Sequence, residues 1–225
     1  MGREQSFDHL AERYDRLGEL TDDAVADWLP TVLPDRRRRA IDLGCGAGRH
    51  AVVLAEYFDH VDAIDLSGPM IRLARRKRPR SNLSYLEAGI LDIAGQYDFV
   101  TSSATLHHVA DLPAVLRHIR SLVAVGGRAA LADTVSPRPA NPRWRLYGNE
   151  IRKLGRNLIQ RSPGDAWEIF RLSTGDWLDH RVSDRYLSRT TFEQAYGAVF
   201  PAGRFTRVGN QHAVIWSRPE PTGLI

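Results

Sequence analysis

Short apolar runs alternate with amphipathic stretches from residue 40 of this 225-residue chain onward. The runs have the length of buried strands, and the stretches between them repeat apolar residues at helical spacing. This alternation is typical of a parallel sheet covered by helices on both faces. We therefore expect an α/β fold with a doubly wound, Rossmann-like sheet of seven strands. The predicted strands are 40–43, 61–65, 83–87, 97–102, 128–133, 204–208 and 213–217.

Capping residues mark the ends of several predicted helices. Asp111 precedes a helix predicted over residues 111–125, and the two glycines that follow are expected to end it. Near the C-terminus, Thr190 and Glu193 have the spacing of a capping box, which predicts a helix through residue 196. These helices would return the chain between successive strands.

Two segments do not follow the alternation. Residues 6–33 form two amphipathic patterns ahead of the first strand, typical of lid helices over the open end of a sheet. Residues 134–188 hold four prolines, three tryptophans and apolar residues at helical spacing, which predicts a helical insertion after the fifth strand. We expect one domain, with N-terminal lid helices over 1–35, a core over 36–133, a helical cap over 134–188, and a helix and final strands over 189–225.

Composition excludes several classes of protein. The chain is 43% hydrophobic and 26% charged, and it has no apolar stretch near the roughly 20 residues that a membrane helix needs. The N-terminus lacks the apolar segment of a secretory signal, and the single cysteine, Cys45, can form no intrachain disulfide. We expect a cytoplasmic protein, a monomer or homodimer, with no membrane partner.

The net charge of +4 comes almost entirely from arginine. The basic runs 36–39 and 75–80 lie between periodic segments and alternate with no aromatic residues, which favours a solvated surface over a nucleic-acid patch. We therefore expect no nucleic-acid partner.

A glycine loop follows the first predicted strand, in the sequence AIDLGCGAGRH at residues 40–50. The dinucleotide fingerprint needs a third glycine where Arg49 stands, and a phosphate loop needs a Lys-Ser or Lys-Thr pair that is absent. Asp42, two residues ahead of the first glycine, would repel a pyrophosphate but suits a ligand with an ammonium group. Asp65, about 20 residues on, is placed to accept from ribose hydroxyls. An amino-acid end and a ribose together describe S-adenosylmethionine.

On these residues the chain resembles the class I S-adenosylmethionine-dependent methyltransferases, within their small-molecule group of type 11/25-like domains. The resemblance covers residues 38–133 and is looser over FDHLAERYD at 7–15 and over the final strands. Its motifs are DLGCGAG, VDAIDLS, GILDI and YDFVTSSATLHHV, in the order that the family has them.

The resemblance implies a role for each motif residue. Asp65 would bind the ribose, Asp92 the adenine amino group, and Tyr14 would close over the cofactor as part of the lid. Ordinary packing is the alternative for Tyr14, and Cys45 suits a packing residue better than a nucleophile. The implied cofactor-binding residues are Tyr14, Asp42, Gly44, Cys45, Gly46, Gly48, Asp65, Leu66, Ile90, Leu91, Asp92, Ser102 and Ser103.

The catalytic candidates follow the fourth predicted strand, at the edge of the sheet where ligands bind in such folds. His107 or His108 is a natural base for an acceptor hydroxyl, and we favour His107, with Asp133 as a second pocket residue. Trp144 and Tyr147 of the predicted cap would form an apolar roof over the acceptor, although they could equally form the cap's own core. We expect no metal.

The expected activity is transfer of a methyl group from S-adenosylmethionine to the oxygen, nitrogen or carbon of a small molecule, with an aromatic or polyketide-like acceptor favoured by the roof. Three alternatives stay open. One is an enzyme of the same fold that uses the bound sulfonium for a cyclisation or decarboxylation, another is a non-catalytic partner protein, and the third, disfavoured by Arg49 and Asp42, is a dinucleotide oxidoreductase.

Overall fold

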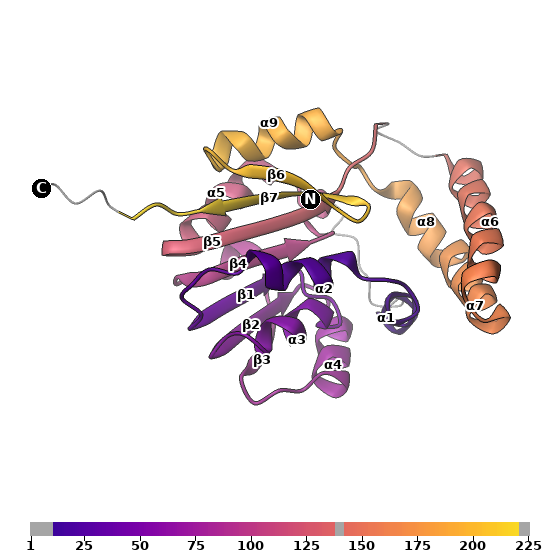
Figure 1. Ribbon diagram of the computed structural model, residues 1–225, viewed down its shortest axis with the longest axis horizontal. Coiled ribbons are helices and arrows are strands. Elements are labelled where there is room, and N and C mark those ends of the chain that lie inside the picture. The colour runs from indigo at the N-terminus through magenta and orange to yellow at the C-terminus, as the bar shows by residue number, and fades with distance from the viewer. Residues whose placement is uncertain (1–10, 138–141, 221–225) are drawn as a thin grey trace, which may run out of the picture.

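The computed structural model describes residues 11–137 and 142–220, which form a seven-stranded sheet flanked by helices (Figure 1). The strand order is β3-β2-β1-β4-β5-β7-β6. The first five strands pair in parallel, and β7 runs antiparallel to both β5 and β6. The predicted α/β sheet is therefore confirmed. The strands are β1 Arg39–Leu43, β2 His60–Asp65, β3 Leu83–Glu87, β4 Tyr97–Ser103, β5 Val123–Thr134, β6 Arg204–Val208 and β7 Gln211–Ser217.

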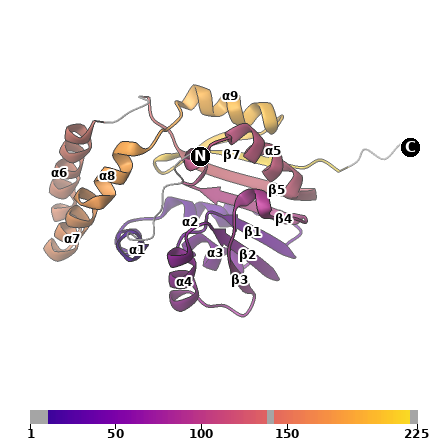
Figure 2. The same cartoon turned by 180° about the vertical axis from the view of Figure 1, so that it is seen from behind.

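Helices cover both faces of the sheet (Figures 1 and 2). On one face α2, α3 and α4 contribute to one apolar cluster, and on the other face α5 and α9 contribute to a second. The strands between them are buried on both sides, which explains why they read as continuous apolar runs. These helices are α2 Ala24–Trp28, α3 Arg49–Ala55, α4 Gly68–Lys77, α5 Leu112–Leu122 and α9 Arg189–Val199.

Two predicted helix boundaries are wrong. Helix α5 ends at Leu122 rather than at residue 125, because Val123 already belongs to β5 and pairs with Tyr97 of β4. Ser188, not Thr190, caps α9 by accepting a hydrogen bond from the backbone N–H of Thr191. At α5 a contact between strands decides against the local helical signal, whereas at α9 the deciding contact is a local cap that begins two residues earlier.

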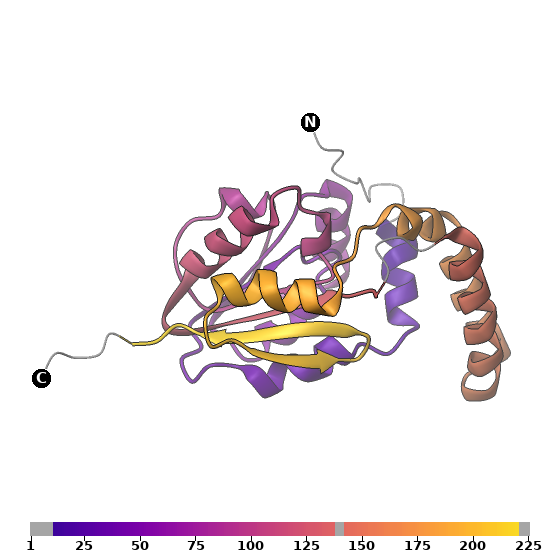
Figure 3. The same ribbon diagram turned by 90° about the horizontal axis from the view of Figure 1, so that it is seen from above.

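The segment after β5 is helical, as predicted. It forms α6 Arg143–Gln160, α7 Pro163–Thr174 and α8 Asp176–Ser183. These helices stand beyond the carboxyl ends of the parallel strands, and α6 packs on α7 and α8 (Figures 1 and 3). Residues 138–141 of the predicted cap lie outside the described residues. None of the helices in the described part of the chain is long and apolar enough to cross a membrane.

The N-terminal helix α1, Ala11–Glu19, is fastened to α4 by ion pairs. Asp15 is buried and lies 2.6 Å from Lys77 Nζ and 2.9 Å from an Arg78 guanidinium nitrogen. The basic run at 75–80 is mostly exposed, as expected, and two of its residues also hold the N-terminal helix. Residues 6–10 of the first predicted helix lie outside the described residues.

Residues of the other basic run, at 36–39, also form ion pairs within the protein. Arg36 forms an ion pair with the buried Asp98, and Arg39 forms one with Asp62. The second carboxylate oxygen of Asp98 accepts hydrogen bonds from the backbone N–H groups of Arg38 and Arg39. Asp98 therefore fixes the start of β1, opposite the edge that carries the glycine loop.

Candidate active site

The glycine loop leaves β1 in a left-handed conformation that only glycine adopts without strain. Gly44, Gly46 and Gly48 have φ angles of +74°, +53° and +83°. A Cβ at Gly44 would lie 2.2 Å from Thr105 Cγ2, and one at Gly48 would lie 2.5 Å from the Tyr85 hydroxyl. A Cβ at Gly46 would meet only Tyr14, at 4.0 Å. The missing Cβ atoms of Gly44 and Gly48 therefore let Thr105 and Tyr85 pack against the loop. At Gly46 the missing Cβ instead leaves the backbone open to a ligand.

Asp42 lies beneath this loop and is almost completely buried. Burial raises the pKa of its carboxyl to about 6, although the nearby His50 partly opposes the shift. Within the described residues, its Oδ2 atom has no hydrogen-bond partner. A buried acceptor without a partner costs free energy, and an ammonium group would satisfy it. The residue thus fits the amino-acid end of S-adenosylmethionine.

Asp65 joins the loops that follow β1 and β2. Its two carboxylate oxygens accept hydrogen bonds of 2.8 Å from the backbone N–H groups of Gly46 and Ser67. A carboxylate oxygen can accept more than one hydrogen bond, so these contacts orient the group and leave capacity for a ligand. The sequence did not predict this bridging role.

The residues expected around the adenine are exposed on neighbouring loops. Leu66 and Leu91 expose 59% and 57% of their surface. Ile90, next to Leu91 in the sequence, is half-buried. Asp92 is exposed, and its carboxylate accepts a hydrogen bond from the backbone N–H of Gly89. Flat apolar surface beside a carboxylate suits an adenine ring, and the roles stay a prediction.

The serines at the end of β4 have protein partners. The buried Ser102 donates to the carbonyl of Leu43, and Ser103 donates to the Gln211 side chain. Thr105, which sequence reasoning missed, donates to the carbonyls of Gly44 and Ser103. These hydroxyls tie β4 to the glycine loop, so they support the loop's shape whether or not they contact the cofactor.

Two aromatic residues cover the loop. Tyr14 of α1 is the neighbour of Gly46, and its ring lies 4.9 Å from the ring of Trp177 in α8. Burial raises the pKa of the Tyr14 hydroxyl, with a smaller opposing effect of Arg49. Trp177 lies in the predicted cap but was not singled out. The thiol of Cys45 is buried in the same loop and its pKa is raised by burial, which suits packing.

His107 forms a carboxylate–histidine pair with Asp133. Its Nδ1 atom lies 2.6 Å from Asp133 Oδ1. A carboxylate only accepts, so Nδ1 carries the proton and Nε2 is available to a ligand. Burial lowers the pKa of His107, but the hydrogen bond and the charges of Asp133 and Asp184 outweigh it, so the pKa lies above its usual value. Asp133, expected as a pocket residue, orients His107 instead.

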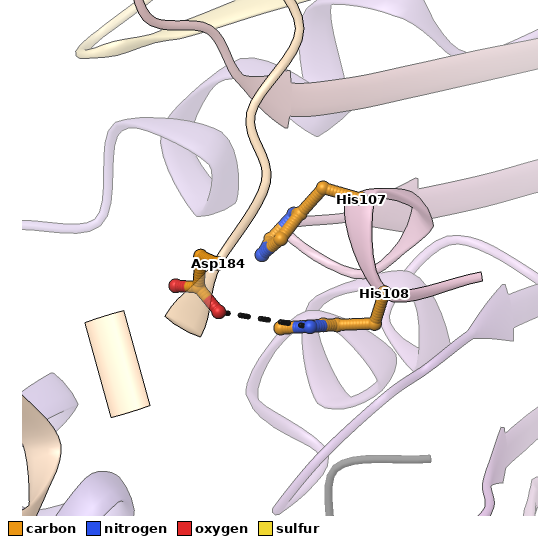
Figure 4. A group of neighbouring side chains, drawn as sticks. All are labelled: His107, His108 and Asp184. Carbon is orange, nitrogen blue, oxygen red and sulfur yellow. Dashed lines mark ion pairs between the residues drawn. The ribbon is translucent and has the colours of Figure 1, made fainter. Parts of the chain in front are cut away.

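His108 belongs to the same cluster. Its Nδ1 atom lies 3.8 Å from Asp184 Oδ1, and its ring centroid lies 3.9 Å from that of His107 (Figure 4). Asp184 follows α8 and is held by the hydroxyl of Tyr186, whose ring packs 4.9 Å from that of His107. One ring nitrogen each of His107 and His108 and a carboxylate oxygen of Asp184, the kinds of atom that bind metal ions, lie within 4.8 Å of one another. The last residues of the predicted cap, after α8, therefore lie against the histidines.

The two aromatic residues expected in the roof lie on α6 and are exposed. Trp144 exposes 75% of its surface and Tyr147 exposes 43%, with the Tyr147 ring 6.0 Å from that of Phe170 in α7. Their contact with an acceptor stays a prediction. A cavity of about 360 Å³ lies between Thr31, Arg128 and Trp216, near the opposite edge of the sheet.

Comparison with known proteins identifies the family. Residues 11–196 match the model of the methyltransferase domain. The chain belongs to this family, the class I S-adenosylmethionine-dependent methyltransferases. The family's cofactor is S-adenosylmethionine, and the buried carboxylate of Asp42 and the open backbone at Gly46 fit it.

Individual relatives agree with the assignment. An uncharacterised methyltransferase of Mycobacterium tuberculosis is 33% identical over 52% of this chain and 61% of its own length, so the chain spans less than two thirds of that relative. The 2-phytyl-1,4-naphtoquinone methyltransferase of a Nostoc species is 26% identical over 63% of this chain and 67% of its own. The DhpI structure with S-adenosylhomocysteine has the same fold, with a TM-score of 0.64 at 20% identity over 96% of this chain and 94% of that one.

Proposed function

We propose that the methyltransferase transfers the methyl group of S-adenosylmethionine to a hydroxyl oxygen of a small, largely apolar molecule. The observation that carries the proposal is the hydrogen-bonded pair of His107 and Asp133 at the carboxyl edge of the sheet. His107 follows β4, which pairs with β1, and Thr105 of the same segment donates a hydrogen bond to the glycine loop. The Nostoc relative is named for a naphthoquinone, which is a small aromatic acceptor.

Each part of the site has a task in this proposal. Asp42 would bind the ammonium group, Asp65 the ribose, and Leu66, Leu91 and Asp92 the adenine. The bound sulfonium supplies an activated methyl group, so the protein's main contribution is to position the acceptor and exclude water. Tyr14 and Trp177 would exclude water from the glycine loop.

His107 would remove the proton of the acceptor hydroxyl through Nε2. Asp133 holds the imidazole in the required tautomer and stabilises its protonated form, which favours proton acceptance near neutral pH. His108, whose Nδ1 atom lies 3.8 Å from Asp184 Oδ1, would contact the acceptor and fix its orientation. A pair of this kind is unnecessary for a nitrogen acceptor that is already unprotonated, which is why we favour oxygen.

The test is to incubate the purified protein with S-adenosylmethionine and a panel of phenols and hydroxynaphthoquinones. We expect S-adenosylhomocysteine and an O-methylated product in equal amounts. The variant His107→Ala should bind the cofactor but lose most of the activity, whereas His60→Gln, at the far end of β2, should resemble the wild type. Cofactor binding without any methylated product would instead favour the non-methylating enzyme, and absence of cofactor binding would overturn the assignment.

We also propose that this chain works in a reducing, cytoplasmic setting, as a monomer or homodimer. The support is the sole cysteine, Cys45, which is buried and free. The small-molecule acceptor needs neither a nucleic-acid nor a protein substrate surface.

A further inference from the structure

Helix α6 carries most of its large apolar residues on its exposed side. Trp144, Ile151 and Leu158 are seven residues apart and expose 75%, 52% and 49% of their surfaces. Tyr147, 43% exposed, lies on the same side, and through Phe170 it adjoins Trp167 of α7, which is 59% exposed. We call these residues, with Ile159, the hairpin surface: Trp144, Tyr147, Ile151, Leu158, Ile159 and Trp167.

The opposite side of α6 is buried and holds one leucine, Leu146, beside two polar residues. Glu150 exposes only 2% of its surface and forms ion pairs with Lys153 and Arg181, while Asn157 is also buried. A helix on a protein surface ordinarily buries its apolar side and exposes its charges. Helix α6 departs from this pattern, because five of its large apolar side chains are exposed while Glu150 and Asn157 are buried. Contiguous exposed apolar side chains on a domain surface are typical of a site that meets a partner.

The net charge of the hairpin formed by α6 and α7 indicates what kind of partner this surface meets. Residues 143–171 contain seven basic and three acidic residues, a net charge of +4 that equals the net charge of the whole chain. The remainder of the protein is thus electrically balanced. Within the described residues, Arg145, Arg152 and Arg156 form no ion pair, and their spacing places them on one flank of the apolar stripe. Tryptophan and isoleucine beside arginine form the pattern of a helix that lies in a membrane interface.

We infer that the hairpin surface docks on an anionic lipid membrane. Two copies of the chain would bring two strongly basic hairpins together, and their charges would repel each other. A nucleic acid would pair with the arginines but would leave Ile151, Leu158 and Ile159 in water, because aliphatic side chains offer no ring for a base to stack on. A bilayer with anionic headgroups satisfies both features, since the apolar side chains enter the acyl boundary and the arginines reach the phosphates.

This docking mode needs no spanning helix, and it differs from the expectation of no membrane partner only at the membrane surface. It would place the carboxyl edge of the sheet, where α6 to α8 stand, toward the bilayer (Figures 1 and 3). An acceptor dissolved in the membrane would then reach the site without crossing water. The inference stands on the surface itself and does not depend on the methyl-transfer proposal.

Co-sedimentation of the full chain with lipid vesicles tests the inference. We expect binding to equimolar phosphatidylcholine and phosphatidylglycerol, little binding to phosphatidylcholine alone, and a decrease as salt is added. Replacing Arg145, Arg152 and Arg156 by glutamine should weaken the partition by about a hundredfold, at roughly a factor of five per arginine. The double variant Trp144→Gln, Ile151→Gln should weaken it by about tenfold or more through lost apolar burial.

Matched controls separate surface chemistry from general charge. A variant with Arg80, Arg117 and Arg204 changed to glutamine loses the same charge from exposed sites elsewhere and should bind vesicles nearly as the wild type does. Cofactor binding, measured on every variant, reports correct folding and tests the methyltransferase assignment separately. Equal binding to both vesicle types, or none, would overturn the inference. A dimer in light scattering that Trp144→Gln, Ile151→Gln makes monomeric, without vesicle binding, would also overturn it, as would tRNA binding that needs only the arginines.

Discussion

Asp133 at the end of β5 accepts a 2.6 Å hydrogen bond from Nδ1 of His107, which lies in the short helix after β4. The two residues are 26 positions apart, and the parallel pairing of β4 with β5 brings them to the same edge of the sheet. The same oxygen of Asp133 also accepts from the backbone N–H of Thr134, so the carboxylate is fixed before any ligand binds. This relationship fixes the orientation of the His107 imidazole.

The first prediction concerns the pH dependence of methyl transfer. His107 acts as a base only when it is unprotonated, so the rate should fall as the pH drops below its raised pKa. Asp133→Asn removes the negative charge that raises this pKa, and the acidic limb of the profile should move to lower pH while the maximal rate falls by about 100-fold or more. A rate–pH profile of both proteins measures it, and an unmoved limb would remove His107 as the base.

The second prediction concerns Asp42. Its pKa of about 6 in the folded protein lies above its unfolded value of about 3.9. The folded state therefore binds the proton more tightly, and the associated stability is present at low pH and is lost as the pH rises through 6. Without cofactor, Asp42→Asn should raise the free energy of unfolding by about 2 kcal/mol at pH 8, and the gain should shrink toward pH 5.

The same variant should bind S-adenosylmethionine about a hundredfold more weakly, because a buried charge partner of the ammonium group is lost. Calorimetry and denaturant unfolding on one preparation give both numbers. Asp59→Asn, at an exposed site, is the matched control and should change neither. Unchanged affinity with Asp42→Asn would show that the carboxylate does not meet the ligand.

The third prediction compares two glycines. Gly48→Ala places a Cβ 2.5 Å from the Tyr85 hydroxyl at a φ of +83°, so we expect a loss of about 2 kcal/mol or more in the free energy of unfolding. Gly148→Ala, in the exposed middle of α6 with nothing within 4 Å, should instead stabilise by about 0.5–1 kcal/mol. Denaturant unfolding distinguishes the two, and equal effects would contradict the loop geometry.

The fourth prediction concerns the lid helix α1. Asp15→Asn removes the buried partner of Lys77 and Arg78, so α1 should detach and expose Tyr14. We expect the dissociation constant of S-adenosylmethionine to rise about tenfold, together with faster proteolysis in α1. Glu12→Gln breaks an exposed ion pair between the same two helices and should have almost no effect. Slow proteolysis of the Asp15 variant would mean that packing alone holds the helix.

The sheet was predictable because its signals are local. Strands buried on both faces need continuous apolar runs, as in β1, β2 and β4, and each of the seven predicted runs overlaps a strand of the structure. The glycine loop was equally readable, because positive φ angles at Gly44, Gly46 and Gly48 demand residues without a Cβ. The exceptions follow from tertiary contacts, since Val123 continues a helical pattern locally but pairs with Tyr97 in the sheet.

The site was readable only in part. Asp42 and the histidines could be named from their positions after strands, but their partners could not. Asp184 and Tyr186 come from a segment some 75 residues after the histidines, and no spacing rule links the two. Thr105 offered only its position after β4 as a signal, and Trp177 offered only membership of an aromatic-rich segment.

The sequence by itself therefore determined the class of fold, the cofactor loop and the residue types that meet a charged ligand, because backbone conformation and strand burial constrain each residue locally. Only the tertiary structure decided that Asp133 orients His107, that Asp15 holds the lid, and that α6 turns its tryptophan outward. These depend on which distant segments pack together. The helical period of α6 shows that it has an apolar side, but only the packing of α7 and α8 against the side of Leu146 and Glu150 shows which side is exposed.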